Sequence, residues 1–160
     1  IEALKSGKDV ALVTDAGTPG ICDPGGILVE AAIKENIKVV PIPGPTALAS
    51  LLSVCGVKSD RFLFLGFLPQ KKGRQTLMKG LMKISGMDLY DVVVLYESPY
   101  RILRTLTDLQ LFIGNKYVIV GRELTKKFEE VVRGNIADVI VQLKKTEPRG
   151  EYVVVMKAGK

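Results

Sequence analysis

Two short stretches of the sequence place carboxylates beside cations. The first, "YESPYR", contains Glu97 and Arg101, and the second, "RELTKK", contains Glu123, Lys126 and Lys127. A carboxylate in such a setting can act as a general base, and a nearby cation can lower the pKa of a hydroxyl group that has to react. These residues are therefore the candidates for acid–base chemistry in this chain.

Each glutamate also has a structural interpretation. Glu97 could cap a helix beside Ser98, and Glu123 could form an ion pair with Arg122 or Arg101. Both glutamates come at the ends of predicted strands, which is where α/β proteins bind their ligands. That shared position favours a functional role for the pair.

A third stretch, "PQKKGRQTLMKGLMK", concentrates positive charge. Lys71, Lys72 and Arg74 lie in a predicted loop, whereas Lys79 and Lys83 fall on what we expect to be a solvated helix face. Lysine and arginine bind phosphates through a salt-sensitive interaction that does not depend on base sequence. The net charge of +6 also favours a polyanionic partner, and the absence of Trp leaves base stacking a minor role.

Several kinds of chemistry are excluded or disfavoured. The chain contains no histidine, which excludes Ser-His-Asp and Cys-His mechanisms and His-ligated zinc within these residues. The two cysteines, Cys22 and Cys55, match no metal-site spacing, and we expect both to be buried thiols and the chain to bind no metal.

The chain carries no sequence signal for a membrane or for secretion. No apolar run approaches the roughly 20 residues that a membrane-spanning helix needs. The first residues, "IEALKSGKDV", show no signal-peptide pattern and no initiating Met. We therefore expect a cytoplasmic protein without membrane contact, of which this chain is a fragment.

Apolar residues alternate between strand-like and helical spacing along the chain. Strands are expected at residues 10–14, 38–43, 61–67, 91–97, 116–124, 129–134 and 150–159, and helices at 27–35, 45–54, 73–84, 100–113 and 135–145. This alternation predicts an α/β fold whose sheet is covered on both faces and is at least partly parallel. Asn135 is the expected cap of the last helix.

The segment "CGVKSDR" (55–61) is interpreted as a linker between two α/β lobes. We expect residues 1–57 to be the C-terminal part of a first lobe and residues 58–160 to be a second, complete lobe.

Two predicted strand ends are rich in glycine and proline. They are "VTDAGTPGICDPGG" (13–26) and "PIPGPTA" (41–47). The first is longer than the roughly 2–6 residues that usually join a strand to a helix. Its glycine spacing fits neither a dinucleotide-binding fingerprint nor a P-loop. Because glycine lets a ligand approach the backbone closely, the two segments together predict one concave binding site.

Five motifs together resemble a known family. The motifs are "VTDAGTPGICDPG", "VVPIPGPTALASLLSVCG", "FLFLGFLPQKKGR", "LYESPYRIL" and "GRELTKKFEEVVRG". Their order and spacing are similar to those of the tetrapyrrole methylases, and in particular of the bacterial branch that 2′-O-methylates a cytidine of the small-subunit ribosomal RNA. The family's first strand and a helical C-terminal extension have no counterpart here, so we expect the first lobe to be incomplete.

The resemblance implies S-adenosylmethionine as the cofactor, held in a cleft between the two lobes. Residue by residue, it implies cofactor contacts from the following positions: Ala16, Gly17, Thr18, Ile21, Thr46, Ala47, Glu97 and Leu124. The family's aspartate is replaced here by Thr18. The strand ends at 15–21, 43–47, 96–97 and 123–124 are expected to face a single cleft.

The resemblance also implies partners and a reaction. The substrate would be ribosomal RNA of the small subunit, contacted by Lys71, Lys72, Arg74 and Lys127, and the protein would be a homodimer that uses apolar residues of the strand at 61–67, such as Leu63, Phe64 and Phe67. Two alternatives stay open: a methyltransferase of the same fold that acts on a porphyrin or corrin, and an RNA-binding module without transfer activity. The basic loop favours RNA over a tetrapyrrole, and the intact "AGTP" and "PGPTA" turns favour an active enzyme.

Overall fold

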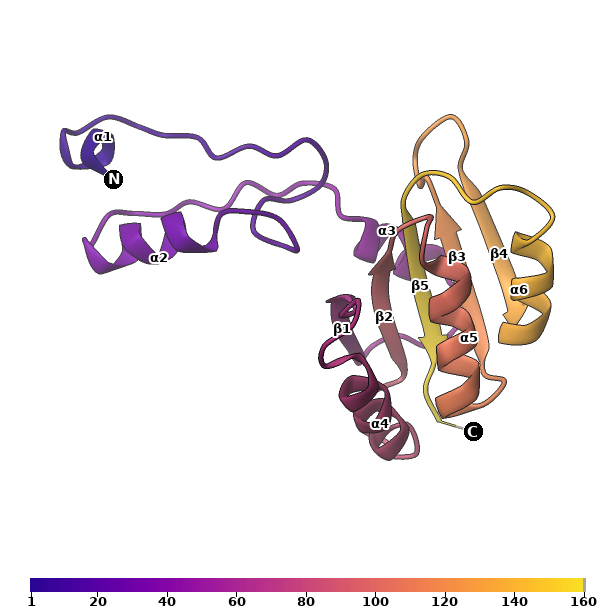
Figure 1. The fold of residues 1–160 in the computed structure, drawn as a ribbon. Helices are drawn as coiled ribbons and strands as arrows, with labels where there is room; N and C mark the ends of the chain where they lie inside the picture. The colour runs from indigo at the N-terminus through magenta and orange to yellow at the C-terminus, as the bar shows by residue number, and fades with distance from the viewer. Residues whose placement is uncertain (160) are drawn as a thin grey trace. The chain divides into compact units, whose positions relative to one another are not determined.

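The computed structural model describes residues 1–159, which form two compact units, Ile1–Thr46 and the segment from Ala47 onward. The first unit contains helix α1 (Glu2–Lys5) and helix α2 (Gly26–Lys34), joined by turns and extended segments. The second unit contains a five-stranded sheet and four helices (Figure 1). Its elements are α3 (Ala47–Val54), β1 (Phe62–Phe67), α4 (Arg74–Ile84), β2 (Val92–Glu97), α5 (Ile102–Ile113), β3 (Tyr117–Arg122), β4 (Glu130–Asn135), α6 (Ile136–Leu143) and β5 (Tyr152–Lys157).

The predicted strands at 10–14 and 38–43 are wrong. Both segments are apolar, yet neither pairs with another segment among residues 1–159, and side chains such as Val13 and Ile42 stay 80% and 78% exposed. A β-strand exists only where a neighbouring strand takes up its backbone hydrogen bonds. Hydrophobic patterning therefore identified apolar segments here, but it could not supply their partners.

The sheet of the second unit is mixed, as expected. Its strand order is β1-β2-β5-β3-β4, with β1 parallel to β2 and every other neighbouring pair antiparallel. Because β5 runs antiparallel to both β2 and β3, those two strands point the same way (Figure 1). Strand β1 is parallel to β2 and therefore shares their direction. Their carboxyl ends consequently meet at one edge of the sheet.

Alternating side chains of the strands fill two separate cores. Helices α4, α5 and α6 cover one face, where Val93 and Leu95 of β2 are buried with Leu106 of α5. Helix α3 covers the other face, where Val92 and Val94 are buried with Leu51. Both faces are thus shielded from water, as the apolar strand at 91–97 predicted.

The compact units divide before α3, although the sequence placed a lobe boundary at 57/58. Leu51 of α3 is fully buried against the sheet, and Arg133 of β4 donates a hydrogen bond to the carbonyl of Val54 at the end of α3, at 2.6 Å. These contacts join α3 to the second unit. The lobe boundary at 57/58 stays a prediction.

Asn135 occupies the N-cap position of α6, but its side chain makes no capping hydrogen bond. Asn115, which precedes β3, takes that role, because its Oδ1 accepts a hydrogen bond from the backbone N–H of Ala137 at 2.9 Å. The capping group therefore comes from a residue 22 positions away, where sequence spacing gives no sign of it.

Candidate functional site

The residues that the sequence singled out in the second unit gather at the carboxyl edge of the sheet. Glu97 ends β2, and Arg122 ends β3. Both pair in register with Tyr152, the first residue of β5, which lies between them. The turn after β2 and the loop that begins at Glu123 therefore lie beside each other at this edge.

Neighbouring residues of β2 nevertheless serve opposite faces. Leu95 belongs to the core under α4, α5 and α6, whereas Tyr96 packs with the α3 core. By the alternation of a strand, Glu97 faces the same side as Leu95. The carboxylate thus lies on the side of the sheet away from α3, while Tyr96 faces α3.

Glu97 is 1% exposed, and both of its carboxylate oxygens are engaged. Its Oε1 accepts from the backbone N–H of Ser98 at 2.8 Å and pairs with the guanidinium of Arg101 at 2.7 Å. Its Oε2 accepts from the hydroxyl of Thr105 at 2.7 Å. This carboxylate is a buried structural anion, and a substrate cannot reach it without breaking those contacts.

Arg74, predicted to bind RNA, is buried instead, with 6% of its surface exposed. Its guanidinium forms an ion pair with Asp108 at 2.7 Å and donates to the hydroxyl of Thr105 at 2.9 Å. A phosphate would have to displace these partners. The structure therefore gives Arg74 a different setting from the adjacent Lys71 and Lys72, which are exposed.

Glu123 starts the loop after β3 in a strained backbone conformation, with φ at +46°. Its Oε1 accepts from the backbone N–H of Glu151 at 2.9 Å and from the ammonium of Lys126 at 3.1 Å. These hydrogen bonds, with that from Glu151 the stronger, hold the pKa of Glu123 below its ordinary value.

Lys126 is shared between two carboxylates, because its ammonium also pairs with Glu151 at 2.9 Å. The hydrogen bond to Glu151 and that to Glu123 raise the pKa of Lys126. The ion pair considered from the sequence, between Glu123 and Arg122 or Arg101, does not form: Arg122 pairs with Glu130 at 3.5 Å.

Exposed cations remain at this edge. Lys127 is exposed, and its ammonium lies 5.7 Å from the centre of the Phe128 ring. Lys71 and Lys72 are exposed in the loop between β1 and α4. The carboxyl ends of β1 and β3 therefore each carry lysines that face solvent.

An aromatic cluster supports the start of α3. The hydroxyl of Tyr96 accepts a hydrogen bond from the backbone N–H of Leu48 at 3.2 Å, and its ring makes edge contacts with Phe64 and Phe67. Leu124 packs against the same core. The sequence did not predict that Tyr96 supports α3. The available signal was an aromatic residue one position before Glu97, which by the alternation of a strand faces the opposite side of the sheet.

In the first unit, the two glycine- and proline-rich turns lie against each other. The hydroxyl of Thr18 donates to the carbonyl of Pro45 at 3.2 Å, and the hydroxyl of Thr14 bonds to the carbonyls of Ala16 and Gly17 at 3.2 and 3.3 Å. The hydrogen bond from Thr18 therefore holds the predicted cofactor contacts of the first turn beside the second turn.

The first turn needs its glycines for backbone conformation. Gly17 and Gly20 have φ values of +78° and +82°, which L-residues rarely adopt. A Cβ at Gly17 would meet only the carbonyl oxygen of Pro45, at 3.9 Å, so the space above it is open. Cys22, expected to be buried, is exposed with a φ of +59°, whereas Cys55 is buried as expected.

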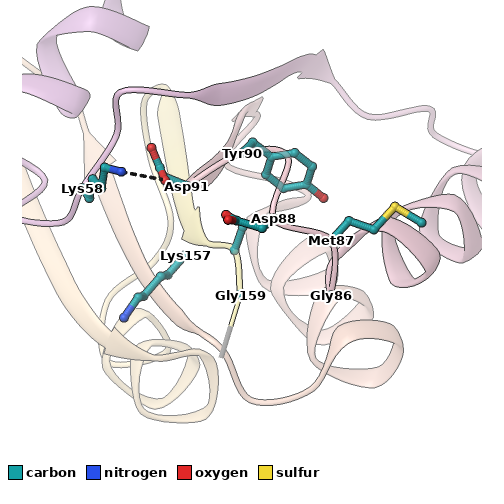
Figure 2. A pocket seen from close by; sticks show the side chains of 9 residues that line it. Lys58, Gly86, Met87, Asp88, Tyr90, Asp91, Lys157 and Gly159 are labelled. Atoms are coloured by element: carbon teal, nitrogen blue, oxygen red, sulfur yellow. Dashed lines mark ion pairs between the residues drawn. The ribbon is translucent and has the colours of Figure 1, made fainter.

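The second unit has a cavity of about 390 Å³ at the opposite end of the sheet (Figure 2). It lies beside Tyr90 and Asp91, which precede β2, and Lys157, which ends β5. Asp91 pairs there with Lys58 at 3.7 Å and with Arg61 at 3.3 Å. The hydrogen bond from the Arg61 backbone lowers the pKa of Asp91, and burial raises that of Tyr90. This cavity is separate from the candidate site.

Residues 1–159 offer no membrane-spanning helix and no cluster of metal ligands. No helix in that range has the length and apolar character required to cross a membrane. No group of three or more His, Cys, Asp or Glu side chains there is arranged to hold a metal ion.

Comparison with known proteins identifies the class. Residues 1–140 match the model of the family described as Tetrapyrrole (Corrin/Porphyrin) Methylases. Because the match spans most of the chain, the protein belongs to this family.

Within the family, the chain is similar to proteins named Ribosomal RNA small subunit methyltransferase I. The relative from Thermotoga maritima is 44% identical, over 96% of this chain and 67% of its own length. The relative from Synechocystis is 45% identical, over 96% of this chain and 54% of its own length, and that from Bacillus subtilis is 39% identical over 99% and 53%. The chain thus spans about half to two thirds of the length of these relatives.

Solved structures share the fold. The methyltransferase CobJ superposes with a TM-score of 0.69 at 20% identity, covering 98% of this chain and 67% of CobJ. A uroporphyrin-III C-methyl transferase from Thermus thermophilus, complexed with S-adenyl homocysteine, superposes with a TM-score of 0.55 at 17% identity, covering 87% of this chain and 62% of that protein. At these identities the likeness concerns the fold, and it agrees with the predicted α/β class.

Proposed function

We propose that this chain is part of an S-adenosylmethionine-dependent methyltransferase that modifies the ribose 2′-hydroxyl of a cytidine in small-subunit ribosomal RNA. One observation carries the proposal: relatives 39–45% identical along nearly the whole chain are named for methylation of small-subunit ribosomal RNA. The methyltransferase CobJ and the uroporphyrin-III C-methyl transferase are only 20% and 17% identical to this chain, and they support only the fold.

The charge at the carboxyl edge of the sheet agrees with an RNA substrate. Lys71, Lys72 and Lys127 are exposed there, and lysines bind RNA by neutralising phosphates and releasing counterions. Arg74 is left out of this contact set because its guanidinium is buried against Asp108 and Thr105.

The first unit fits a cofactor that is held by its backbone. The turns at Gly17 and Gly44 touch through Thr18, and a Cβ on either glycine would meet nothing closer than 3.8 Å. A ligand can therefore approach the backbone of both turns. We propose that Ala16, Gly17, Thr18, Ile21 and Thr46 bind S-adenosylmethionine, which supplies the methyl group when bound.

In the second unit, Ala47 and Leu124 are the proposed cofactor contacts. Ala47 is the exposed first residue of α3, and Leu124 packs in the α3 core. Tyr96 holds the next residue, Leu48, through its hydroxyl. We propose that Tyr96 thereby fixes the start of α3 for cofactor binding.

Methyl transfer to a hydroxyl depends on alignment more than on covalent chemistry by the protein. We propose that Glu123 and Lys126 assist removal of the proton from the ribose hydroxyl. Their side chains are 21% and 46% exposed, so a substrate can reach them. A carboxylate with a lowered pKa is charged at neutral pH and can accept a proton, while the lysine favours an alkoxide. Glu97 and Arg101 form an ion pair in which Glu97 is buried and Arg101 is partly buried. This pairing supports a positioning role for both residues.

The proposal also includes a homodimer in the cytoplasm, where bacterial ribosomal RNA is found. Phe62 and Phe67 are 46% and 52% exposed on β1, which is an outermost strand of the sheet. Leu63 and Phe64 pack against the two cores of their own chain. We therefore assign the contact between the two subunits to Phe62 and Phe67. Light scattering from the full-length protein should give the mass of a dimer. The mass of a monomer at micromolar concentration would contradict this assignment.

The substrate class is tested by offering both substrates to the full-length protein. Labelled S-adenosylmethionine is incubated with small ribosomal subunits that lack the modification and, separately, with a porphyrin precursor. We expect label in the RNA alone. Label in the tetrapyrrole would support the alternative substrate, and cofactor binding without any transfer would indicate a non-catalytic module.

A further inference from the structure

The loop that carries Lys71 and Lys72 is held at its base by two arginine side chains, of which that of Arg74 is buried and that of Arg101 is partly buried. Nη1 of Arg101 donates a hydrogen bond to the carbonyl of Leu68 at 3.1 Å. Nη1 of Arg74 donates a hydrogen bond to the carbonyl of the next residue, Pro69, at 3.1 Å. Two consecutive carbonyls at the start of the loop are therefore each fixed by an arginine.

Both arginines are tied to one carboxylate. Arg101 pairs directly with Glu97 at 2.7 Å. Arg74 reaches it through Thr105, whose hydroxyl accepts from Arg74 at 2.9 Å and donates to Glu97 at 2.7 Å. We call this set of four residues, Glu97, Arg101, Thr105 and Arg74, the loop clamp.

The hydrogen bonds of the clamp are buried, since Glu97 and Thr105 are 1% and 0% exposed. Each of these bonds involves a charged group, and such bonds are short and costly to leave unmade in a dry interior. Thr105 is the connecting member because a hydroxyl can donate and accept at the same time. Nε of Arg74 donates a hydrogen bond to Oδ2 of Asp108 at 2.8 Å, which keeps the guanidinium in place.

We propose that Glu97, through the loop clamp, is a positioning residue for RNA binding: it holds the loop of Lys71 and Lys72 in the conformation that meets the phosphates. This inference rests on the proposed function. A loop of lysines that is held in place loses less conformational freedom when it binds than a mobile one does. The clamp itself has no contact with RNA, since its central members are buried.

Thr105 allows the matched test, because valine has nearly the same shape without the hydroxyl, and serine keeps the hydroxyl. In the full-length protein, Thr105→Val should weaken binding to the small ribosomal subunit and flatten its salt dependence. Each phosphate contact contributes about 0.7–0.9 to the slope of log K against log salt. We expect the slope to fall by about 1 in Thr105→Val, with wild-type binding in Thr105→Ser and unchanged cofactor affinity in both.

A second comparison separates positioning from general destabilisation. In a protein that already carries Lys71→Ala and Lys72→Ala, adding Thr105→Val should leave RNA affinity unchanged, because there is no charge left for the clamp to position. Equal weakening in both backgrounds would overturn the inference, as would wild-type affinity in Thr105→Val alone. Failure of the wild-type protein to bind RNA in a salt-dependent way would instead refute the proposed function, and the inference with it.

Discussion

Gly150, just before β5, offers a sharp test of the loop that contains Glu123. Gly150 has a φ of +74°, and a Cβ at this position would lie 2.5 Å from Cγ, Cδ and Oε1 of Glu123. Gly150→Ala therefore creates two separate costs. The left-handed backbone alone costs about 1–2 kcal/mol for a residue with a side chain.

The second cost comes from moving Glu123. Its carboxylate has to leave the backbone N–H of Glu151, and a hydrogen bond to a charged group contributes about 1.5–3 kcal/mol. Partial exposure of Glu123, at 21%, puts this loss at the lower end, and the surface contact with Lys126 adds little. The expected total loss of unfolding free energy is about 3 kcal/mol.

Urea unfolding of the full-length protein, followed by circular dichroism, measures this loss. The control is the same substitution in a Glu123→Ala background, where the clash is absent. There Gly150→Ala should cost only the backbone contribution of about 1–2 kcal/mol. An equal cost in both backgrounds would contradict this prediction, because it would show that Gly150 and Glu123 are not coupled.

Three further outcomes follow from the site. Replacing Glu123 by Gln should lower stability at pH 7. Because the pKa of Glu123 is lowered in the folded state, the difference from wild type should shrink as the pH falls below the ordinary glutamate pKa, and it should be lost once the pH is below the lowered pKa; a difference that does not shrink as urea titrations are carried to acidic pH would contradict it. Tyr96→Phe removes the acceptor for Leu48 and should weaken cofactor binding several-fold in calorimetric titrations, while Phe64→Leu, which keeps that acceptor, should not. Lys127→Ala should weaken RNA binding at low salt and have no effect at high salt, and weakening that does not depend on salt would count against a phosphate contact.

Local patterns were sufficient to predict most of the second unit. Strand β2 and helix α5 begin within two residues of their predicted positions, because apolar spacing reports directly which side of an element is buried. The segments at 10–14 and 38–43 have the same apolar character, but strand formation depends on a pairing partner. That information is not local to either segment.

The candidate site was predicted by position more accurately than by role. Sequence placed Glu97 and Glu123 at strand ends, and both lie at the same edge of the sheet. It treated Arg74 as part of a basic loop, whereas Thr105 and Asp108, about 30 positions away, bury its guanidinium. These two partners look like ordinary helix residues in the sequence, so only the packing of α4 against α5 shows what they do.

The most direct test of the proposed activity locates the transferred methyl group. Small ribosomal subunits that lack the modification are treated with the full-length protein and labelled S-adenosylmethionine, and their RNA is then digested to nucleosides and separated. We expect label in 2′-O-methylcytidine and in no other nucleoside. Label on a base, or on the ribose of another nucleoside, would contradict it.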